Sequence, residues 1–106
     1  MEAENNEFFN ELAGMIEHLN LLAKSTIPHY RQFVHGVENG VITDINQIEH
    51  EMDHMLSFCF DDDVLVLYKR VLRKIFNQYP EIVKFYIEAY YDMYSDDDDN
   101  EDELDD

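Results

Sequence analysis

The sequence predicts an all-α protein, a single small irregular helical bundle of about five helices followed by a disordered acidic C-terminal tail. Three observations lead to this class. Apolar residues recur with a 3.6-residue period through most of the chain. Only 3 Gly and 2 Pro interrupt 106 residues, so few turns are available. The hydrophobic fraction of 45%, with 7 Tyr and 7 Phe, suffices for one modest core.

The first two helices are expected at about 5–23 and 28–38. The Ser25–Thr26 pair is expected to separate them, because Pro28 suits the first turn of a new helix. Gly40 is placed to end the second helix. The apolar side chains expected on the inward face of the first helix are Phe8, Leu12, Met15, Ile16, Leu19 and Leu22.

The remaining helices are expected at about 44–59, 62–78 and 80–94. Thr43 or Asp44 can cap the first of them. The acidic run 61–63 precedes the second, a favourable position for negative charge at a helix N-terminus. Pro80 is placed to begin the last helix.

Charge divides the chain unevenly. Asp and Glu total 25 against 7 Lys and Arg, which gives a net charge of −18. Residues 1–94 are expected to form the helical domain. Residues 95–106 hold nine acids and no apolar period, so they are expected to be a disordered acidic tail. A basic protein surface is the expected partner, whereas direct binding of nucleic acid is disfavoured.

The cellular setting follows from what the chain contains. The single cysteine, Cys59, cannot form an internal disulfide and suits a reducing compartment. The acidic N-terminus has no apolar segment typical of a signal peptide. Apolar runs are far too short to span a bilayer, so we expect no membrane contact and a cytoplasmic location, in a bacterial host cell if the gene is phage-borne.

The stretch His50 to His54 has the pattern H-E-x-x-H. On a helix the two histidines share one face and can bind one zinc ion, while Glu51 can activate a metal-bound water. The pattern resembles the zinc-metalloprotease signature, although Asp53 replaces an uncharged residue and no third ligand is evident. A solvated helix face is the favoured interpretation, so no catalytic residue, metal or cofactor is predicted.

Acidic side chains on the first and third helices and the corner before the fourth are the predicted partner-binding residues. They are Glu4, Glu7, Glu11, Glu17, Asp44, Glu49, Glu51, Asp53, Asp61, Asp62 and Asp63. A basic run occurs on one helix, at Lys69, Arg70, Arg73 and Lys74. It can bind phosphate, pair with neighbouring acids, or receive the acidic tail. Outward aromatic residues such as Phe85 or Tyr91 suit a protein interface, including a homodimer.

The stretch from Ala23 to Tyr30, AKSTIPHY, followed by an aromatic helix and an acidic tail, resembles the layout of the Ocr-type antirestriction proteins of phages. The shared features are length, charge, helical content and a Pro-His-Tyr step. The basic fourth helix and the H-E-x-x-H depart from that layout. The resemblance implies a dimeric DNA mimic that occupies a restriction enzyme.

The sequence therefore predicts a non-enzymatic acidic inhibitor that mimics nucleic acid and blocks a host defence protein, a restriction or CRISPR effector. Carboxylates on a rigid helical surface can present a field like that of DNA, which carries one charge per about 1.7 Å. One alternative is an immunity or antitoxin protein that neutralises one basic toxin. Another is a small zinc-dependent hydrolase that uses residues 50–54.

Overall fold

The computed structural model describes residues 2–94, with side chains from residue 6 onward. Within this range the chain forms helices without strands, and the expected all-α class is confirmed. Four helices are present where about five were expected. They are α1 (Glu2–Glu38), α2 (Ile45–Leu56), α3 (Asp62–Ile75) and α4 (Pro80–Tyr94). The predicted tail, 95–106, lies outside the described residues, and so does the side chain of Glu4.

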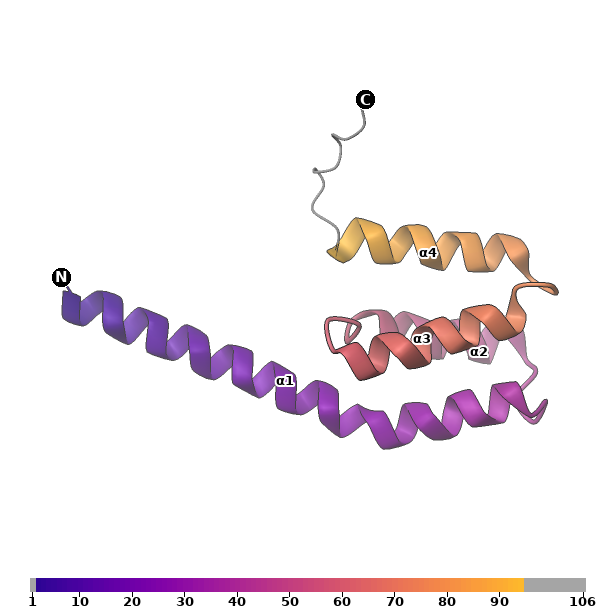
Figure 1. The fold of residues 1–106 in the computed structure, drawn as a ribbon, viewed down its shortest axis with the longest axis horizontal. Coiled ribbons are helices and arrows are strands. Elements are labelled where there is room, and N and C mark those ends of the chain that lie inside the picture. Colours follow the sequence, from indigo (N-terminus) through magenta and orange to yellow (C-terminus); the bar gives the residue numbers. More distant parts are fainter. Residues whose placement is uncertain (1, 95–106) are drawn as a thin grey trace, which may run out of the picture.

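The predicted helix break before Pro28 is wrong, because α1 continues through it as one 37-residue helix. Pro28 has no N–H to donate to the carbonyl group one turn earlier. Two hydroxyl groups satisfy carbonyl oxygens nearby. Ser25 Oγ donates to the Leu22 oxygen and Thr26 Oγ1 to the Ala23 oxygen, each at 2.6 Å. Such side-chain bonds and an internal proline both bend a helix, and α1 changes direction along its length (Figure 1).

α1 has two parts with different surroundings. The C-terminal part buries one face in the bundle, and this packing holds the helix together across the proline. Its buried residues are Ala23, Ile27, Tyr30, Phe33, Val34 and Val37. Residues 6–22, called the arm below, have only exposed side chains. Figure 1 shows the arm extending away from the other three helices.

The inward face predicted for the arm is therefore wrong. Its apolar side chains are 39–63% exposed, although their helical spacing is the one expected for a core. The reason is length, since α1 spans about 55 Å at 1.5 Å per residue and α3 only about 21 Å. The described chain is accordingly elongated, with a radius of gyration of 17.3 Å against about 12 Å for a compact domain of this size.

α3 lies at the centre of the bundle and packs against α1, α2 and α4. It buries residues on more than one side, namely Val64, Leu67, Tyr68, Val71, Leu72 and Ile75. Two tyrosine hydroxyl groups then fasten α4. Tyr68 Oη donates to the Tyr86 carbonyl oxygen at 2.9 Å, and Tyr94 Oη donates to the Leu56 carbonyl oxygen at 2.6 Å. The bonds give the buried hydroxyl group of Tyr68 and the partly buried one of Tyr94 a partner, and they fix the position of α4.

The end of α1 confirms the role predicted for Gly40. This residue has φ +77°, a backbone conformation that favours glycine. The Val41 N–H donates to the Gly36 carbonyl oxygen at 2.8 Å, and the Gly40 N–H donates to the Val37 carbonyl oxygen at 3.2 Å. These two bonds form a Schellman motif, which turns the chain toward α2.

Aspartates cap the N-termini of α2 and α3. Of the two candidates at the start of α2, Thr43 and Asp44, the structure selects Asp44, and the acidic run 61–63 lies at the start of α3, where it was expected to favour the helix N-terminus. Asp44 Oδ1 accepts a hydrogen bond from the Asn46 N–H at 3.0 Å. Asp61 Oδ1 accepts from the N–H groups of Asp63 at 2.8 Å and Val64 at 3.2 Å. Within residues 2–94, no helix combines the length and the apolar content that crossing a bilayer requires.

Candidate functional site

The eleven predicted partner-binding acids fall into three separate groups on the molecule. The structure places Glu4, Glu7, Glu11 and Glu17 in the arm half of α1, Asp44, Glu49, Glu51 and Asp53 at or on α2, and Asp61, Asp62 and Asp63 at the start of α3. The three groups lie on different elements of the fold. The three groups also differ in what their carboxylates contact.

The acids of the arm face solvent and have no Lys or Arg neighbour in the arm. Glu7, Glu11 and Glu17 are exposed, and residues 6–22 contain no Lys or Arg. Their carboxylates make no ion pair with another described residue. The arm is therefore a helical rod with free negative charge that extends away from the bundle.

The acids of α2 largely serve the fold. Glu51 Oε1 lies 3.0 Å from His29 Nε2 of α1. Asp53 Oδ1 accepts a hydrogen bond of 2.7 Å from the Tyr86 hydroxyl group of α4. Burial, and then this bond to Asp53, raise the pKa of Tyr86 above its ordinary value. These carboxylates join α2 to its neighbours, so they have less freedom to bind a partner.

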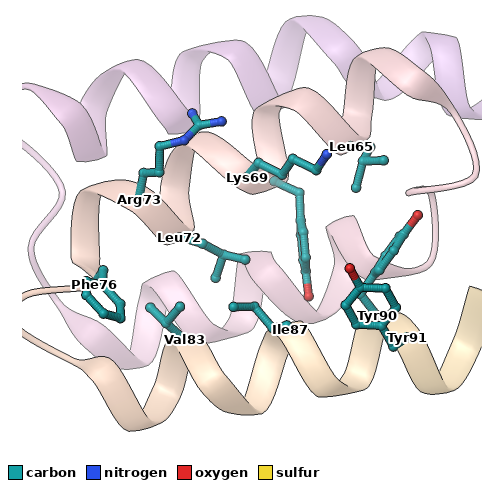
Figure 2. A pocket seen from close by; sticks show the side chains of 10 residues that line it. Leu65, Lys69, Leu72, Arg73, Phe76, Val83, Ile87, Tyr90 and Tyr91 are labelled. Atoms are coloured by element: carbon teal, nitrogen blue, oxygen red, sulfur yellow. The ribbon is translucent and has the colours of Figure 1, made fainter. Parts of the chain in front are cut away.

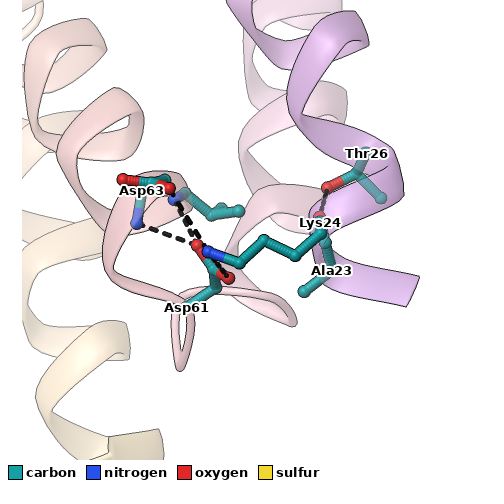
Figure 3. Close-up of polar contacts among 6 residues, drawn as sticks. Ala23, Lys24, Thr26, Asp61 and Asp63 are labelled. Atoms are coloured by element: carbon teal, nitrogen blue, oxygen red, sulfur yellow. Dashed lines mark hydrogen bonds and ion pairs between the residues drawn. The ribbon is translucent and has the colours of Figure 1, made fainter. Parts of the chain in front are cut away.

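The corner before α3 is organised around the buried carboxylate of Asp61. Lys24 Nζ of α1 lies 2.9 Å from Asp61 Oδ2 and 3.3 Å from Asp63 Oδ2. Figure 3 shows the Lys24 side chain reaching toward these two carboxylates. Burial alone would raise the pKa of Asp61. The hydrogen bond from Lys24 and the two capping N–H groups outweigh burial and lower that pKa below its ordinary value. Of the three acids in this corner, Asp62 is exposed and makes no such ion pair with a described residue.

The H-E-x-x-H stretch lies on α2, and its two histidines share a face as the spacing predicts. The ring centroids of His50 and His54 are 4.6 Å apart, and both side chains are exposed. Glu51 binds His29 instead of facing them. Among residues 2–94, no three His, Cys, Asp or Glu side chains gather closely enough to hold a metal ion. This geometry matches a solvated helix face.

The basic run on α3 is divided between two roles. Arg70 binds Glu38 of α1 through two bonds, Nε to Oε2 at 3.0 Å and Nη2 to Oε1 at 2.6 Å. The bond from Arg70 lowers the pKa of Glu38 below its ordinary value. Lys69, Arg73 and Lys74 are exposed and form no ion pair with a carboxylate in the described part of the chain. Pairing with an acidic neighbour, one of the alternatives from sequence, therefore applies to Arg70.

A groove between α3 and α4, with a volume of about 580 Å³, was not predicted (Figure 2). Its floor contains buried apolar side chains such as Leu72 and Val83, and Lys69 and Arg73 extend along its α3 side. The other lining residues are Leu65, Tyr68, Phe76, Ile87, Tyr90 and Tyr91. One feature of the sequence could have indicated the groove. Phe76, Ile87 and Tyr91 are apolar or aromatic residues next to core positions, and they make the apolar faces of their helices wider than one buried stripe requires.

The aromatic residues of α4 include exposed ones, as expected. Phe85 and Tyr91 are 60% and 59% exposed, and Tyr91 is part of the groove.

The thiol of Cys59 is buried, and burial raises its pKa to about 12. It is therefore held protonated and away from solvent.

No protein-family model, no curated protein and no solved structure matches this chain.

Proposed function

We propose that this protein is a non-enzymatic inhibitor that occupies the basic nucleic-acid site of another protein with acidic side chains. The observation that carries the proposal is the arm. Glu7, Glu11 and Glu17 are exposed there, without a Lys or Arg in residues 6–22. In a chain of net charge −18, such a rod favours approach to a basic cleft.

Charge density limits how the arm can act alone. Glu7 to Glu17 spans about 15 Å of helix and carries three charges, or one per about 5 Å. Duplex DNA carries one per about 1.7 Å. Acids from elsewhere must therefore contribute, and the candidates are Asp62 and the nine acids of 95–106. The resemblance to Ocr-type antirestriction proteins makes a restriction enzyme or a CRISPR effector the proposed target.

The test begins with a pull-down from nuclease-treated bacterial lysate, using the full chain as bait. The affinity of the recovered partner is then measured at increasing salt and in competition with duplex DNA. A decoy is expected to bind a nucleic-acid enzyme, to lose affinity steeply with salt, and to be displaced by DNA. A single tight partner that ignores DNA would support the immunity or antitoxin alternative instead.

Matched variants locate the binding charge. The arm variant combines Glu7→Gln, Glu11→Gln and Glu17→Gln. The control removes three exposed acids of α4 by Glu81→Gln, Glu88→Gln and Asp92→Asn, so both variants lose the same net charge. The proposal expects the arm variant to lose at least tenfold more affinity than the control. Equal losses would mean that net charge acts without the arm, and the proposal would be wrong.

A further inference from the structure

We propose that the arm of one protomer docks in the α3–α4 groove of a second copy, and that reciprocal docking makes a closed homodimer. The inference concerns apolar surface, and it does not rest on the proposed function. It joins two features that one molecule leaves open. These are an uncovered amphipathic helix and an apolar groove with a basic edge.

The arm has the apolar pattern of a helix that packs on a core. At 100° per residue, seven of its large apolar side chains fall within an arc of about 140°. They are Phe8, Phe9, Leu12, Met15, Ile16, Leu19 and Leu22. A two-stranded coiled coil needs only a narrow seam, whereas a stripe wider than about 100° typically faces a surface made by more than one helix. The groove between two helices is such a surface.

The dimensions of the two features agree. The 17-residue arm is about 25 Å long, and α3 and α4, with 14 and 15 residues, are about 21 and 22 Å long. A stable interface buries about 800 Å² on each partner. Seven side chains that are 39–63% exposed offer apolar surface on the order of 700 Å² when large side chains count about 200 Å² each.

The charges around the two surfaces favour docking of the arm in the groove of a second copy over pairing of the two arms. Glu11 lies directly beside the apolar arc, at the edge next to Leu22, whereas Glu7 and Glu17 lie on the opposite, polar side. Lys69 and Arg73 line the groove. Docking in the groove therefore brings Glu11 toward basic side chains. Pairing two arms would bring together two rods that contain no Lys or Arg.

The test measures the molar mass of the full chain by light scattering after size exclusion, at concentrations from about 1 to 100 μM, a range in which interfaces of this size are populated. The wild type is expected at twice 12.7 kDa. The double arm variant Leu12→Gln with Leu19→Gln is expected to be monomeric. The groove variants Ile87→Gln and Lys69→Glu with Arg73→Glu are expected to weaken the dimer at least tenfold.

Two control variants and the variant of the basic residues separate loss of the dimer from loss of the fold. Val41→Gln and Val66→Gln change exposed valines outside the arm and the groove and should leave the mass unchanged. Lys69 and Arg73 are exposed, so their variant keeps the fold even if Ile87→Gln perturbs it. A monomeric wild type overturns the proposal. So does a dimer that the arm variant breaks but both groove variants leave intact, because that result means arm-to-arm pairing.

Discussion

Lys24 Nζ lies 2.9 Å from Asp61 Oδ2 and joins α1 to the first turn of α3 at the place where α1 enters the bundle. The same carboxylate caps α3 through its other oxygen, which accepts the N–H groups of Asp63 and Val64. One buried side chain thus caps the N-terminus of α3 and holds α1 beside it. Loss of Asp61 should therefore affect both relationships.

Asp61→Ala is expected to lower the free energy of unfolding by about 1–2 kcal/mol, the usual effect of removing an N-cap. Asp61→Asn should cost less, because an asparagine oxygen can still cap the helix. Some loss of stability should remain, because the neutral amide interacts more weakly with Lys24. Urea denaturation followed by circular dichroism measures both values. Asp62→Ala, at the exposed neighbouring position, is the control and should stay within about 0.5 kcal/mol of the wild type. Equal effects at positions 61 and 62 would contradict the assigned role.

The contribution of Asp61 should depend on pH. Its pKa in the folded protein is lowered, mainly because the bond from Lys24 and the capping N–H groups outweigh burial. An aspartate in an unfolded chain has a pKa of about 3.9. The stabilisation is therefore fully present above about pH 4 and is lost as pH falls through the lower folded value. The difference in unfolding free energy between wild type and Asp61→Asn should be constant from about pH 7 to 5 and shrink below about pH 4. A difference that stayed constant to about pH 2 would refute this assignment.

Gly40→Ala is expected to destabilise the protein by about 1–2 kcal/mol, because the alanine must adopt the positive φ of 77° that ends α1. The control is Gly14→Ala in the arm, where an added Cβ meets nothing within 4 Å. That change should instead raise the helical signal, since alanine favours a helix interior. Thermal and urea unfolding of both variants distinguish the two glycines. A neutral Gly40→Ala would show that the turn has an alternative conformation.

Pro28→Ala should stabilise α1, by roughly 1–3 kcal/mol, because the new N–H can donate to the carbonyl oxygen of Lys24 and the ring no longer crowds the preceding turn. Urea denaturation reports the stability, and small-angle scattering reports the direction of the arm through the radius of gyration. Pro28→Gly is the matched control, since it also restores the N–H but has a helix propensity about 1 kcal/mol lower than that of alanine, so it should stabilise α1 less. If Pro28→Ala destabilises the protein, the packing of Ile27 and Tyr30 requires the bend.

Cys59 should be unreactive in the folded protein. Its thiol is buried, and burial raises its pKa to about 12, so very little thiolate exists near neutral pH. A chromogenic disulfide reagent at about pH 8 should modify it only as fast as the protein unfolds, and rapidly in concentrated urea. Rapid modification without denaturant would show that the core around Cys59 opens locally.

Much of the fold follows from local sequence signals. The helix predicted at 80–94 is observed with those bounds, because Pro80 begins it and its apolar period is regular. Gly40 and Asp44 act over two to five residues, so the sequence shows Gly40 as the end of α1 and Asp44 as one of two candidate caps of α2. The break before Pro28 was wrong, because a local breaker was outweighed by burial on both sides of it.

The candidate site was less predictable. Asp53 and Tyr86 are 33 residues apart, and Glu51 and His29 are 22 residues apart, so nothing near either acid reveals that the fold uses it. The acids of the arm are exposed for a different reason, because α1 extends beyond the ends of the helices against which it packs. α1 is longer than its neighbours only because the two helices predicted at 5–23 and 28–38 form one continuous helix.

The sequence by itself determined the helical class, the end of α1 at Gly40 and the large negative charge, since propensity, turn chemistry and composition act within a few residues. The tertiary structure alone decided which apolar stripes are buried. The arm has the same 3.6-residue period as the core helices, yet no described helix reaches far enough to cover it. Burial depends on what lies opposite a helix face, and local sequence does not contain that information.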